Sequence, residues 1–328
     1  KAPSMKTDII ALFDENIHKL LMAPPFMMLA IFTMIPLVYM MLMAFTNYSK
    51  VDEHLLLFDW VGLKNFAEIL NSGSTIGRQF WDVLSWTLTW AFFATFLNFF
   101  LGTFMALIIN RRTTRLKGLW RTVLSLTIAI PQFVSLLYVS KLFTTSGLVG
   151  RVLDMIPFIY DYRMANHFVS LWDSPIVAKI LLIVINIWIG IPYVMLMATG
   201  ILMNIPNDLY ESARIDGASP ARRFFKITLP YMLFVTGPYL ITQFIGNINN
   251  FNVIYLLSGG GPGDIMLYTD GAKGTDLLIT WLYKLSLGTD RNYKLASVIG
   301  ILVFVISAVF SLIVYNKSSA VKGEDNFQ

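Results

Sequence analysis

Two apolar stretches of the sequence carry uncharged polar side chains that repeat at one spacing. The two sets are Asn186, Gly190 and Tyr193 in the first stretch, and Gln243, Asn247 and Asn250 in the second. Residues at positions i, i+4 and i+7 share one face of an α-helix. Amide groups both donate and accept hydrogen bonds, as sugar hydroxyls do. The pattern predicts a polar, uncharged cavity between apolar helices that suits a neutral polyol.

Helix packing is the alternative interpretation of these residues. Asn and Gln side chains hydrogen-bond neighbouring helices in membranes, for roughly 0.6–2 kcal/mol each. The same face pattern in two stretches favours the cavity. Gln132 follows Pro131, and Pro192 precedes Tyr193. A proline removes one backbone hydrogen bond, so these two segments either bend for shape alone or break where they line a cavity.

Ionisable residues are scarce in the apolar stretches and lie near their ends. These residues are Asp82, Lys141, Lys179 and Lys294, while the histidines His18, His54 and His167 fall outside the stretches. We therefore expect no catalytic residue, no metal site and no proton relay. The absence of cysteine excludes disulfides and cysteine-ligated metals.

The rest of the chain, which must position the polar faces, is strongly apolar. Its 328 residues are 56% hydrophobic and 14% charged, with a mean hydropathy of +0.63. A typical soluble domain is about 25% charged, so this chain lacks the polar surface of a soluble globule. The composition also excludes a collagen or disulfide framework and argues against a nucleic-acid partner. It predicts an integral membrane protein, surrounded by lipid and built from α-helices.

Six stretches are long enough to cross a bilayer, whose core of about 30 Å needs about 20 apolar residues in a helix. They are Leu20–Thr46, Phe80–Asn110, Trp120–Phe143, Ile176–Met203, Tyr231–Ser258 and Tyr293–Tyr315. This arrangement predicts an N-terminal segment at 1–19, a first span at 20–46, a core of five spans over 80–315 and a tail at 316–328.

Basic residues concentrate in two of the loops between spans. The segment 111–121 has five Lys or Arg residues and no acid, and 204–230 has four. Short loops rich in Lys and Arg remain in the cytoplasm. We expect both loops and both termini to be cytoplasmic, with the multi-pass chain in the cell membrane.

The second of these loops, 204–230, has the signals of two short helices. Pro206 suits a helix N-terminus and Gly217 a C-terminal stop, while Ser219-Pro220 suits the cap and first residue of a second helix. The second helix is expected to end before Pro230. The loop is therefore predicted to be an ordered helix-turn-helix at the membrane surface.

A specific string runs through this loop: Glu211-Ser212-Ala213, then Gly217, then Ile227-Thr228-Leu229-Pro230. It resembles the EAA loop of permease subunits of bacterial binding-protein-dependent ABC importers, with Ser212 in place of the central alanine. The runs 209–218, 249–262 and 275–278 resemble more narrowly the MalF-like sugar permeases, which handle maltose, maltodextrins and related oligosaccharides. The resemblance covers all six spans and implies the six-helix ABC importer type I permease (MetI-like) fold in a bacterial cell membrane.

The resemblance implies two sets of functional residues. The short EAA helix would dock into the ATP-hydrolysing subunit through Glu211, Ser212, Ala213, Asp216 and Gly217. The intramembrane sugar site of the family carries over to Gln132, Asn186, Trp188, Ile189, Gly190, Tyr193, Gln243, Asn247 and Asn250. Gln243 stands where the family has serine, and Ile128 replaces a tyrosine of the maltose permease, which leaves the exact sugar open. The large external domain of that permease is also missing, since the loop 47–79 has 33 residues.

The chain contains no phosphate-binding loop of the form G-x-x-x-x-G-K-[ST]. We therefore expect no cofactor on this chain and no enzymatic activity, with ATP and Mg on a separate dimer of ATP-binding subunits. The resemblance further implies a second homologous permease and an extracytoplasmic sugar-binding protein as partners, and an oligosaccharide as substrate.

Three other functions remain as alternatives. One is an ABC permease for another polar solute such as glycerol-phosphate, for which a buried arginine is missing. Another is a secondary carrier, which would need a coupling-ion site. A third is a structural membrane protein, for which two polar faces would have no purpose.

Overall fold

The computed structural model describes residues 5–49, 58–111, 113–168, 170–263, 271–288 and 291–317. Within these ranges the fold is all-α, apart from one isolated antiparallel bridge between Thr46 and Trp60. Five helical rods and one sharply bent helix pair are long and apolar enough to cross a membrane, in agreement with the six predicted spans. Beyond Lys317, the predicted tail lies outside the described residues.

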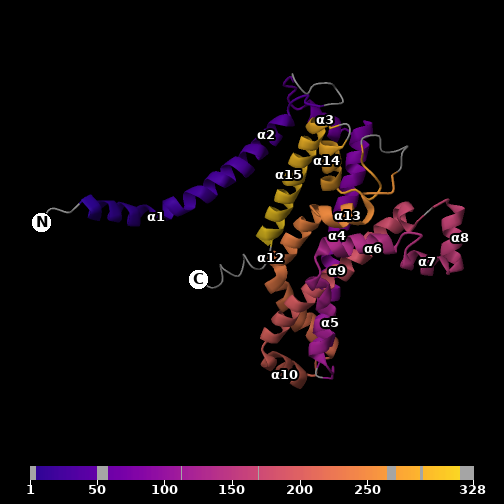
Figure 1. The fold of residues 1–328 in the computed structure, drawn as a ribbon. Helices are drawn as coiled ribbons and strands as arrows, with labels where there is room; N and C mark the ends of the chain where they lie inside the picture. The colour runs from indigo at the N-terminus through magenta and orange to yellow at the C-terminus, as the bar shows by residue number, and fades with distance from the viewer. Residues whose placement is uncertain are drawn as a thin grey trace.

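The helices are named in chain order (Figure 1). The first half of the chain forms α1 (Met5–Leu29), the π-helical η1 (Ala30–Met34), α2 (Ile35–Met43), α3 (Lys64–Leu70), α4 (Thr75–Asn110), α5 (Lys117–Ala129), α6 (Gln132–Leu142), α7 (Leu148–Asp154) and α8 (Pro157–Ala165). The second half forms the short η2 (Leu171–Asp173), α9 (Pro175–Asn204), α10 (Asn207–Ile215), α11 (Pro220–Arg223), the π-helical η3 (Phe224–Thr228), α12 (Leu229–Ile248), α13 (Phe251–Ser258), α14 (Leu278–Leu287) and α15 (Tyr293–Lys317).

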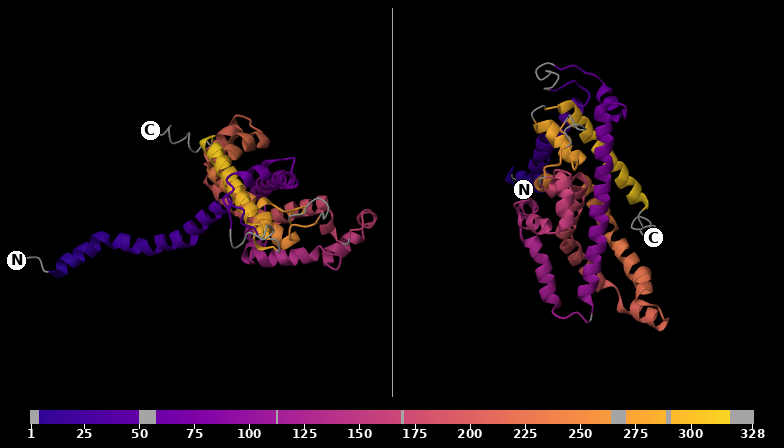
Figure 2. Two further views of the ribbon diagram at one scale, coloured as in Figure 1. Left: turned by 90° about the horizontal axis from the view of Figure 1, so that it is seen from above. Right: turned by 90° about the vertical axis from the view of Figure 1, so that its right-hand side faces the viewer.

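The first span projects away from the other helices as a long arm made of α1, η1 and α2 (Figures 1 and 2). Its C-terminal end is fixed to the body because the Asn65 amide donates hydrogen bonds to the carbonyls of Ala44 and Thr46, both at 2.8 Å. Large apolar side chains are exposed along the arm from Leu20 to Leu42. Near that end α2 packs against α15, while most of the arm presents its apolar side chains on the surface of the described chain.

The most extensive contact between two helices of the described chain joins α4 and α9. Gly102 on α4 faces Val194 on α9, and a β-carbon on Gly102 would lie 2.5 Å from that of Val194. Ala106 and Ala198 are fully buried in the same contact region. Small residues let the two backbones approach, and close packing is a main source of helix association in a membrane.

The third predicted span is broken at Pro131, where α5 and α6 meet at 91°. Pro131 caps the start of α6, as expected for a residue that cannot continue a helix. α6 then packs against α13, and Ser140 Oγ donates a hydrogen bond to the Leu257 carbonyl at 2.7 Å. The break turns the first residue of α6, Gln132, toward the middle of the bundle.

The fifth predicted span, Tyr231–Ser258, is wrong at both ends. The helical rod begins at Pro220 and runs through η3 into α12, so Pro230 does not end a helix but lies in the first turn of α12. α12 stops at Ile248, and Asn250 begins α13 by accepting a hydrogen bond from Val253 N at 3.2 Å. An asparagine side chain favours a helix cap over a helix interior, which explains the break.

The glycine-rich run after α13 turns sharply, with φ of +60° at Gly259 and +82° at Gly260. The chain then forms the short helix α14, which packs against α15. Thr275 N donates to the Gly260 carbonyl at 2.9 Å, and the buried Asp276 pairs with Lys284 at 2.6 Å. One backbone hydrogen bond to the glycine-rich turn and one buried ion pair therefore fix the start of this short helix.

A polar cavity between the helices

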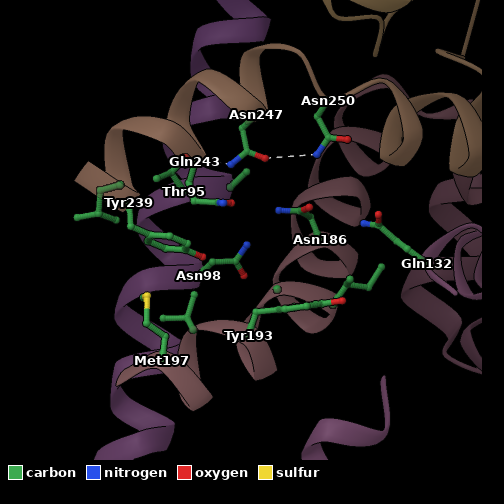
Figure 3. A pocket seen from close by; sticks show the side chains of 15 residues that line it. Thr95, Asn98, Gln132, Asn186, Tyr193, Met197, Tyr239, Gln243, Asn247 and Asn250 are labelled. Carbon is green, nitrogen blue, oxygen red and sulfur yellow. Dashed lines mark hydrogen bonds between the residues drawn. The ribbon is translucent and has the colours of Figure 1, made fainter. Parts of the chain in front are cut away.

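A polar cavity of about 440 Å³ opens between α4, α6, α9 and α12 (Figure 3). Its polar lining comes from four helices and from the cap of α13. These residues are Thr95 and Asn98 on α4, Gln132 on α6, Asn186 and Tyr193 on α9, Tyr239, Gln243 and Asn247 on α12, and Asn250. The two predicted polar faces, which lie about 60 residues apart in the sequence, therefore meet across one space.

The predicted site residues line this cavity, with the exception of Trp188. Trp188 is 48% exposed and lies two positions from Asn186, which places its side chain about 200° around the helix. Ile189 and Gly190 complete the α9 wall. Asn250 reaches the cavity as the cap of α13 and not, as predicted, as the third residue of one helical face.

Some of the cavity amides are engaged with other protein groups. Asn247 Nδ2 donates to Thr95 Oγ1 at 3.0 Å, and Asn250 Nδ2 donates to Asn247 Oδ1 at 3.3 Å. Both atoms of the Asn247 amide are thus used, and Asn250 Oδ1 caps α13. These two asparagines connect α4, α12 and α13, so the packing interpretation holds for part of the polar set.

Two other amides keep an unused hydrogen-bonding atom. Asn98 Oδ1 and Asn186 Nδ2 are buried and have no hydrogen-bond partner among the described residues. Their amide ends face the space between the helices (Figure 3). An unsatisfied buried polar atom costs about 1–3 kcal/mol. A ligand that offers both a donor and an acceptor would satisfy these two atoms.

The sequence interpretation missed the contribution of α4. Thr95 and Asn98 lie three residues apart on α4, and Tyr239 and Met197 add to the wall from α12 and α9. The available signal for Asn98 was an amide in the interior of a 36-residue helix whose other amides, Gln79 and Asn110, lie near its ends. No periodic pattern marked it, because its role depends on the position of α9 beside it.

The cavity lining is uncharged. Among the residues that the structure describes, no Asp, Glu, Lys, Arg or His lines it. The hydroxyl and amide groups can hold a ligand reversibly through hydrogen bonds, while Ile189, Val194 and Leu240 supply apolar wall. This arrangement suits binding and release of a neutral polar molecule.

A second candidate surface lies at the far end of the molecule from α3, where α10 projects (Figure 1). α10 ends in a Schellman turn: Ala218 N donates to the Ala213 carbonyl at 2.8 Å and Gly217 N to the Arg214 carbonyl at 3.0 Å. Gly217 has the positive φ, +73°, that this turn needs. Ser219 then caps α11. The predicted helix-turn-helix is present, although its second helix continues into α12.

α10 has no buried residue in the described chain. Ile215 is 88% exposed, and Glu211, Ser212, Asp216 and Gly217 are also exposed, whereas Ala213 is half-buried. An exposed isoleucine at the tip of an ordered helix, next to acidic groups, forms a rigid surface available to a partner. Ala213 and Asp216 also border a small cleft of about 290 Å³ shared with Arg222 and Lys226.

Comparison with known proteins identifies this combination of features. A family model described as "Binding-protein-dependent transport system inner membrane component" matches residues 98–321. This match takes in the polar cavity from Asn98 onward, α10 and α15.

Several characterised relatives are similar over most of the chain. The maltodextrin transport system permease protein MalC of Streptococcus pneumoniae is 36% identical over 328 residues, covering 98% of this chain and 74% of the relative. The galactooligosaccharides transport system permease protein GanP of Bacillus subtilis is 38% identical, covering 93% and 71%. The maltose/maltodextrin permease MalF of Escherichia coli is 34% identical over 77% of this chain, which spans 48% of MalF.

The fold also has a match among solved structures. A bacterial ABC transporter involved in the import of the acidic polysaccharide alginate contains a chain that aligns with a TM-score of 0.67 and 22% sequence identity. The alignment covers 95% of this chain and 98% of that one. The architecture is therefore that of an ABC importer permease, as predicted.

Proposed function

Because the chain belongs to the family of binding-protein-dependent transport system inner membrane components, and within it is a MalF-like sugar permease, we propose that it carries a neutral oligosaccharide of the maltose or maltodextrin type. The chain is a multi-pass membrane permease subunit of an ABC importer. Its own contribution is a translocation path and not a chemical reaction. ATP hydrolysis is assigned to separate subunits.

The observation that carries the proposal is the uncharged cavity with its two unsatisfied amides. Asn98 offers an acceptor and Asn186 a donor, and a sugar hydroxyl can donate to one group while it accepts from another. Tyr193 and Tyr239 add aromatic rings to the lining, against which the apolar face of a sugar ring can lie. A cavity of about 440 Å³ is within the usual range for small-molecule sites, about 300–1,000 Å³.

The relatives favour an oligosaccharide. Two of those described above are named for maltodextrin or maltose and one for galactooligosaccharides. The alternative of a glycerol-phosphate permease has less support, because a phosphate needs a cation and the described lining has none. The same argument opposes an acidic polysaccharide as the substrate of this chain.

Two exposed surfaces support the proposed partners. The apolar arm of α1 and α2 would pack against a second, homologous permease, which would cover side chains such as Phe26 and Phe32. α10 would dock into one subunit of an ATP-hydrolysing dimer through the predicted residues Glu211 to Gly217. An extracytoplasmic binding protein would deliver the sugar at the opposite end, near α3 and α14.

This orientation follows the basic loops. The loops 111–121 and 204–230, together with both termini, would face the cytoplasm, and the Schellman turn of α10 would keep the docking helix rigid. Closure of the ATPase dimer would then move α10 and, through α11 and η3, the continuous helix α12. Because Gln243 and Asn247 lie on α12, this motion would change the cavity itself. The chain would thus alternate between outward and inward access.

The test is purification of the complex that this chain forms, followed by reconstitution with its binding protein in lipid vesicles. We expect a second permease and an ATP-binding subunit to co-purify. We also expect maltodextrins to stimulate ATP hydrolysis and, with the binding protein outside, to accumulate in vesicles that enclose ATP and in which the ATPase sites face the lumen. Glycerol-phosphate and galactooligosaccharides serve as the competing solutes.

Each of the other outcomes would indicate a different function for this chain. Stimulation by glycerol-phosphate alone would overturn the neutral-sugar assignment and leave the importer intact. Preference for galactooligosaccharides would keep the cavity argument and replace the maltodextrin. Solute movement by the chain alone, without ATP, would indicate a secondary carrier and contradict the docking role of α10.

A further inference from the structure

A second groove lies at the end of the bundle near α10. It has a volume of about 610 Å³ and runs between the end of α4, α10, α11 and η3. We call it the inner groove, and its lining includes Phe104, Leu107, Arg111, Arg223, Phe224 and Phe225. None of these residues lines the polar cavity.

One half of the inner groove continues an apolar face of α4. Phe93, Phe100, Phe104 and Leu107 follow one another at intervals of seven, four and three residues, so they lie along one side of the helix. The three phenylalanines are exposed in the chain, Phe104 at 55%. This face belongs to a helix of 36 residues that is long and apolar enough to cross the membrane. It forms an apolar track that ends at Arg111.

The other half is formed where the fifth span begins. There the helix widens into the π-helical turn η3, which contains Phe224 and Phe225. Phe225 is 62% exposed. Tyr210 and Thr228 close the groove toward α10, with 2.8 Å between their hydroxyl oxygens. π-helical turns are frequent at functional sites.

The groove also contains two arginines at equivalent places in two spans. Arg111 directly follows the last residue of α4, and Arg223 is the last residue of α11, at the start of the rod that becomes α12. Within the described part of the chain, neither arginine forms a salt bridge. Two uncompensated guanidinium groups at the end of an apolar track are complementary to an amphiphile with a negatively charged head.

We propose that the inner groove binds an anionic phospholipid of the cytoplasmic leaflet. The phosphate lies between Arg111 and Arg223, because a planar guanidinium group pairs with phosphate oxygens through two hydrogen bonds. One acyl chain follows Leu107 and Phe104 along α4. Basic pockets at the cytoplasmic ends of membrane helices are suited to such head groups. The inference rests on the proposed orientation and is independent of the transported sugar.

The test uses the assembled transporter in nanodiscs of equal parts phosphatidylcholine and phosphatidylglycerol. The lipids retained on the released complex are counted by native mass spectrometry. We expect the wild type to retain phosphatidylglycerol in preference to phosphatidylcholine. R111Q/R223Q should reduce that preference about tenfold or more, since both charges act at the membrane surface. L107W, which fills the apolar part without a change of charge, should reduce it as well.

The matched control is K19Q/R115Q, which removes two positive charges at the same expected side of the membrane, outside the groove. It should retain phosphatidylglycerol as the wild type does. An equal loss of phosphatidylglycerol in the control would show that the lipid is retained by general attraction to positive charge, and it would refute a specific site in the inner groove. The proposal also fails if R111Q/R223Q and L107W keep the wild-type preference. If the wild type retains no phosphatidylglycerol and R111Q/R223Q loses its ATPase subunits, the groove is a protein interface.

Discussion

Gly190 on α9 leaves the space that the side chain of Asn98 on α4 occupies. A β-carbon at position 190 would lie 2.4 Å from Nδ2 of Asn98 and 2.6 Å from its Oδ1, closer than real contacts allow. The glycine therefore lets the Asn98 amide lie against α9 while its Oδ1 remains without a partner. Gly190 of the family motif and Asn98 on α4, which the sequence interpretation missed, therefore belong to one contact between α9 and α4.

Gly190→Ala should weaken substrate binding without a loss of assembly. The new methyl group displaces the Asn98 amide, and the loss of one hydrogen bond worth about 0.5–1.5 kcal/mol corresponds to roughly 2–10-fold. We expect the maltodextrin concentration for half-maximal ATPase stimulation to rise by that factor. Gly200→Ala on the same helix is the control, because a β-carbon there meets no atom within 4 Å. Equal effects of the two changes would refute the role of Asn98.

Replacement by alanine should affect sugar binding at Asn186 and thermal stability at Asn247. Asn186 Nδ2 has no partner in the described chain, so Asn186→Ala should leave thermal stability near that of the wild type and raise the half-maximal sugar concentration several-fold. Asn247→Ala removes the bonds to Thr95 and Asn250 and should cost about 1–3 kcal/mol of stability. Melting of the purified complex and the ATPase titration give the two readouts. A destabilised Asn186→Ala would assign that amide to packing.

The polar faces of α9 and α12 could be predicted because helical spacing alone places Asn186 beside Gly190 and Gln243 beside Asn247. Helical spacing could not show that Asn98 lines the cavity, because its amide is not part of a repeated polar pattern. The placement of Trp188 could not be read from the motif for a related reason. The motif string includes it, but its position on the helix turns it away from the cavity.

The helix breaks divide in the same way. Pro131 indicated a helix break in the sequence because proline has no backbone N–H to donate. The end of α12 at Ile248 instead depends on Asn250, which caps α13. An asparagine can equally stay in a membrane helix, so only the contacts of α13 decide. α14 was missed because its ten residues are too few for a span. Its place is held by long-range bonds such as Leu278 N to Thr87 Oγ1 at 3.1 Å.

The turn at Gly217 should control coupling and not sugar recognition. Gly217 has φ of +73°, which costs a non-glycine residue about 1–2 kcal/mol, whereas asparagine tolerates it better. We expect Gly217→Val to lower sugar-stimulated ATP hydrolysis strongly with an unchanged half-maximal sugar concentration. Gly217→Asn should restore most of the activity. The control is Gly118→Val near the start of α5, where a β-carbon would meet nothing within 4 Å.

Two results would contradict this role. One is wild-type stimulation in Gly217→Val, which would show that the rigid end of α10 is not needed. The other is an equal loss in Gly217→Asn and Gly217→Val. The defect would then lie in the missing glycine itself and not in the backbone conformation.

Removal of Lys284 from its ion pair with Asp276 should make the stability of the protein depend on pH. Burial raises the pKa of Asp276 above its usual value of 3.8, and the pairing with Lys284 opposes that rise. In Lys284→Met the opposing charge is gone, so the folded-state pKa rises further. A carboxyl group with a raised folded pKa stabilises the fold below its unfolded pKa and loses that contribution as the pH rises through the folded value. The variant should therefore melt at a lower temperature at about pH 8 than at about pH 5.

The double variant D276N/K284M is the control, because it removes both charges together. Leaving one buried charge unpaired costs about 3–5 kcal/mol, while removing both partners is often close to neutral. We expect the double variant to melt near the wild type and to lack the added pH dependence. Melting curves of the detergent-purified complex across this pH range decide the matter. If Lys284→Met melts at the same temperature throughout, Asp276 is not held as a buried carboxylate, and the contact between α14 and the glycine-rich turn depends on its hydrogen bonds alone.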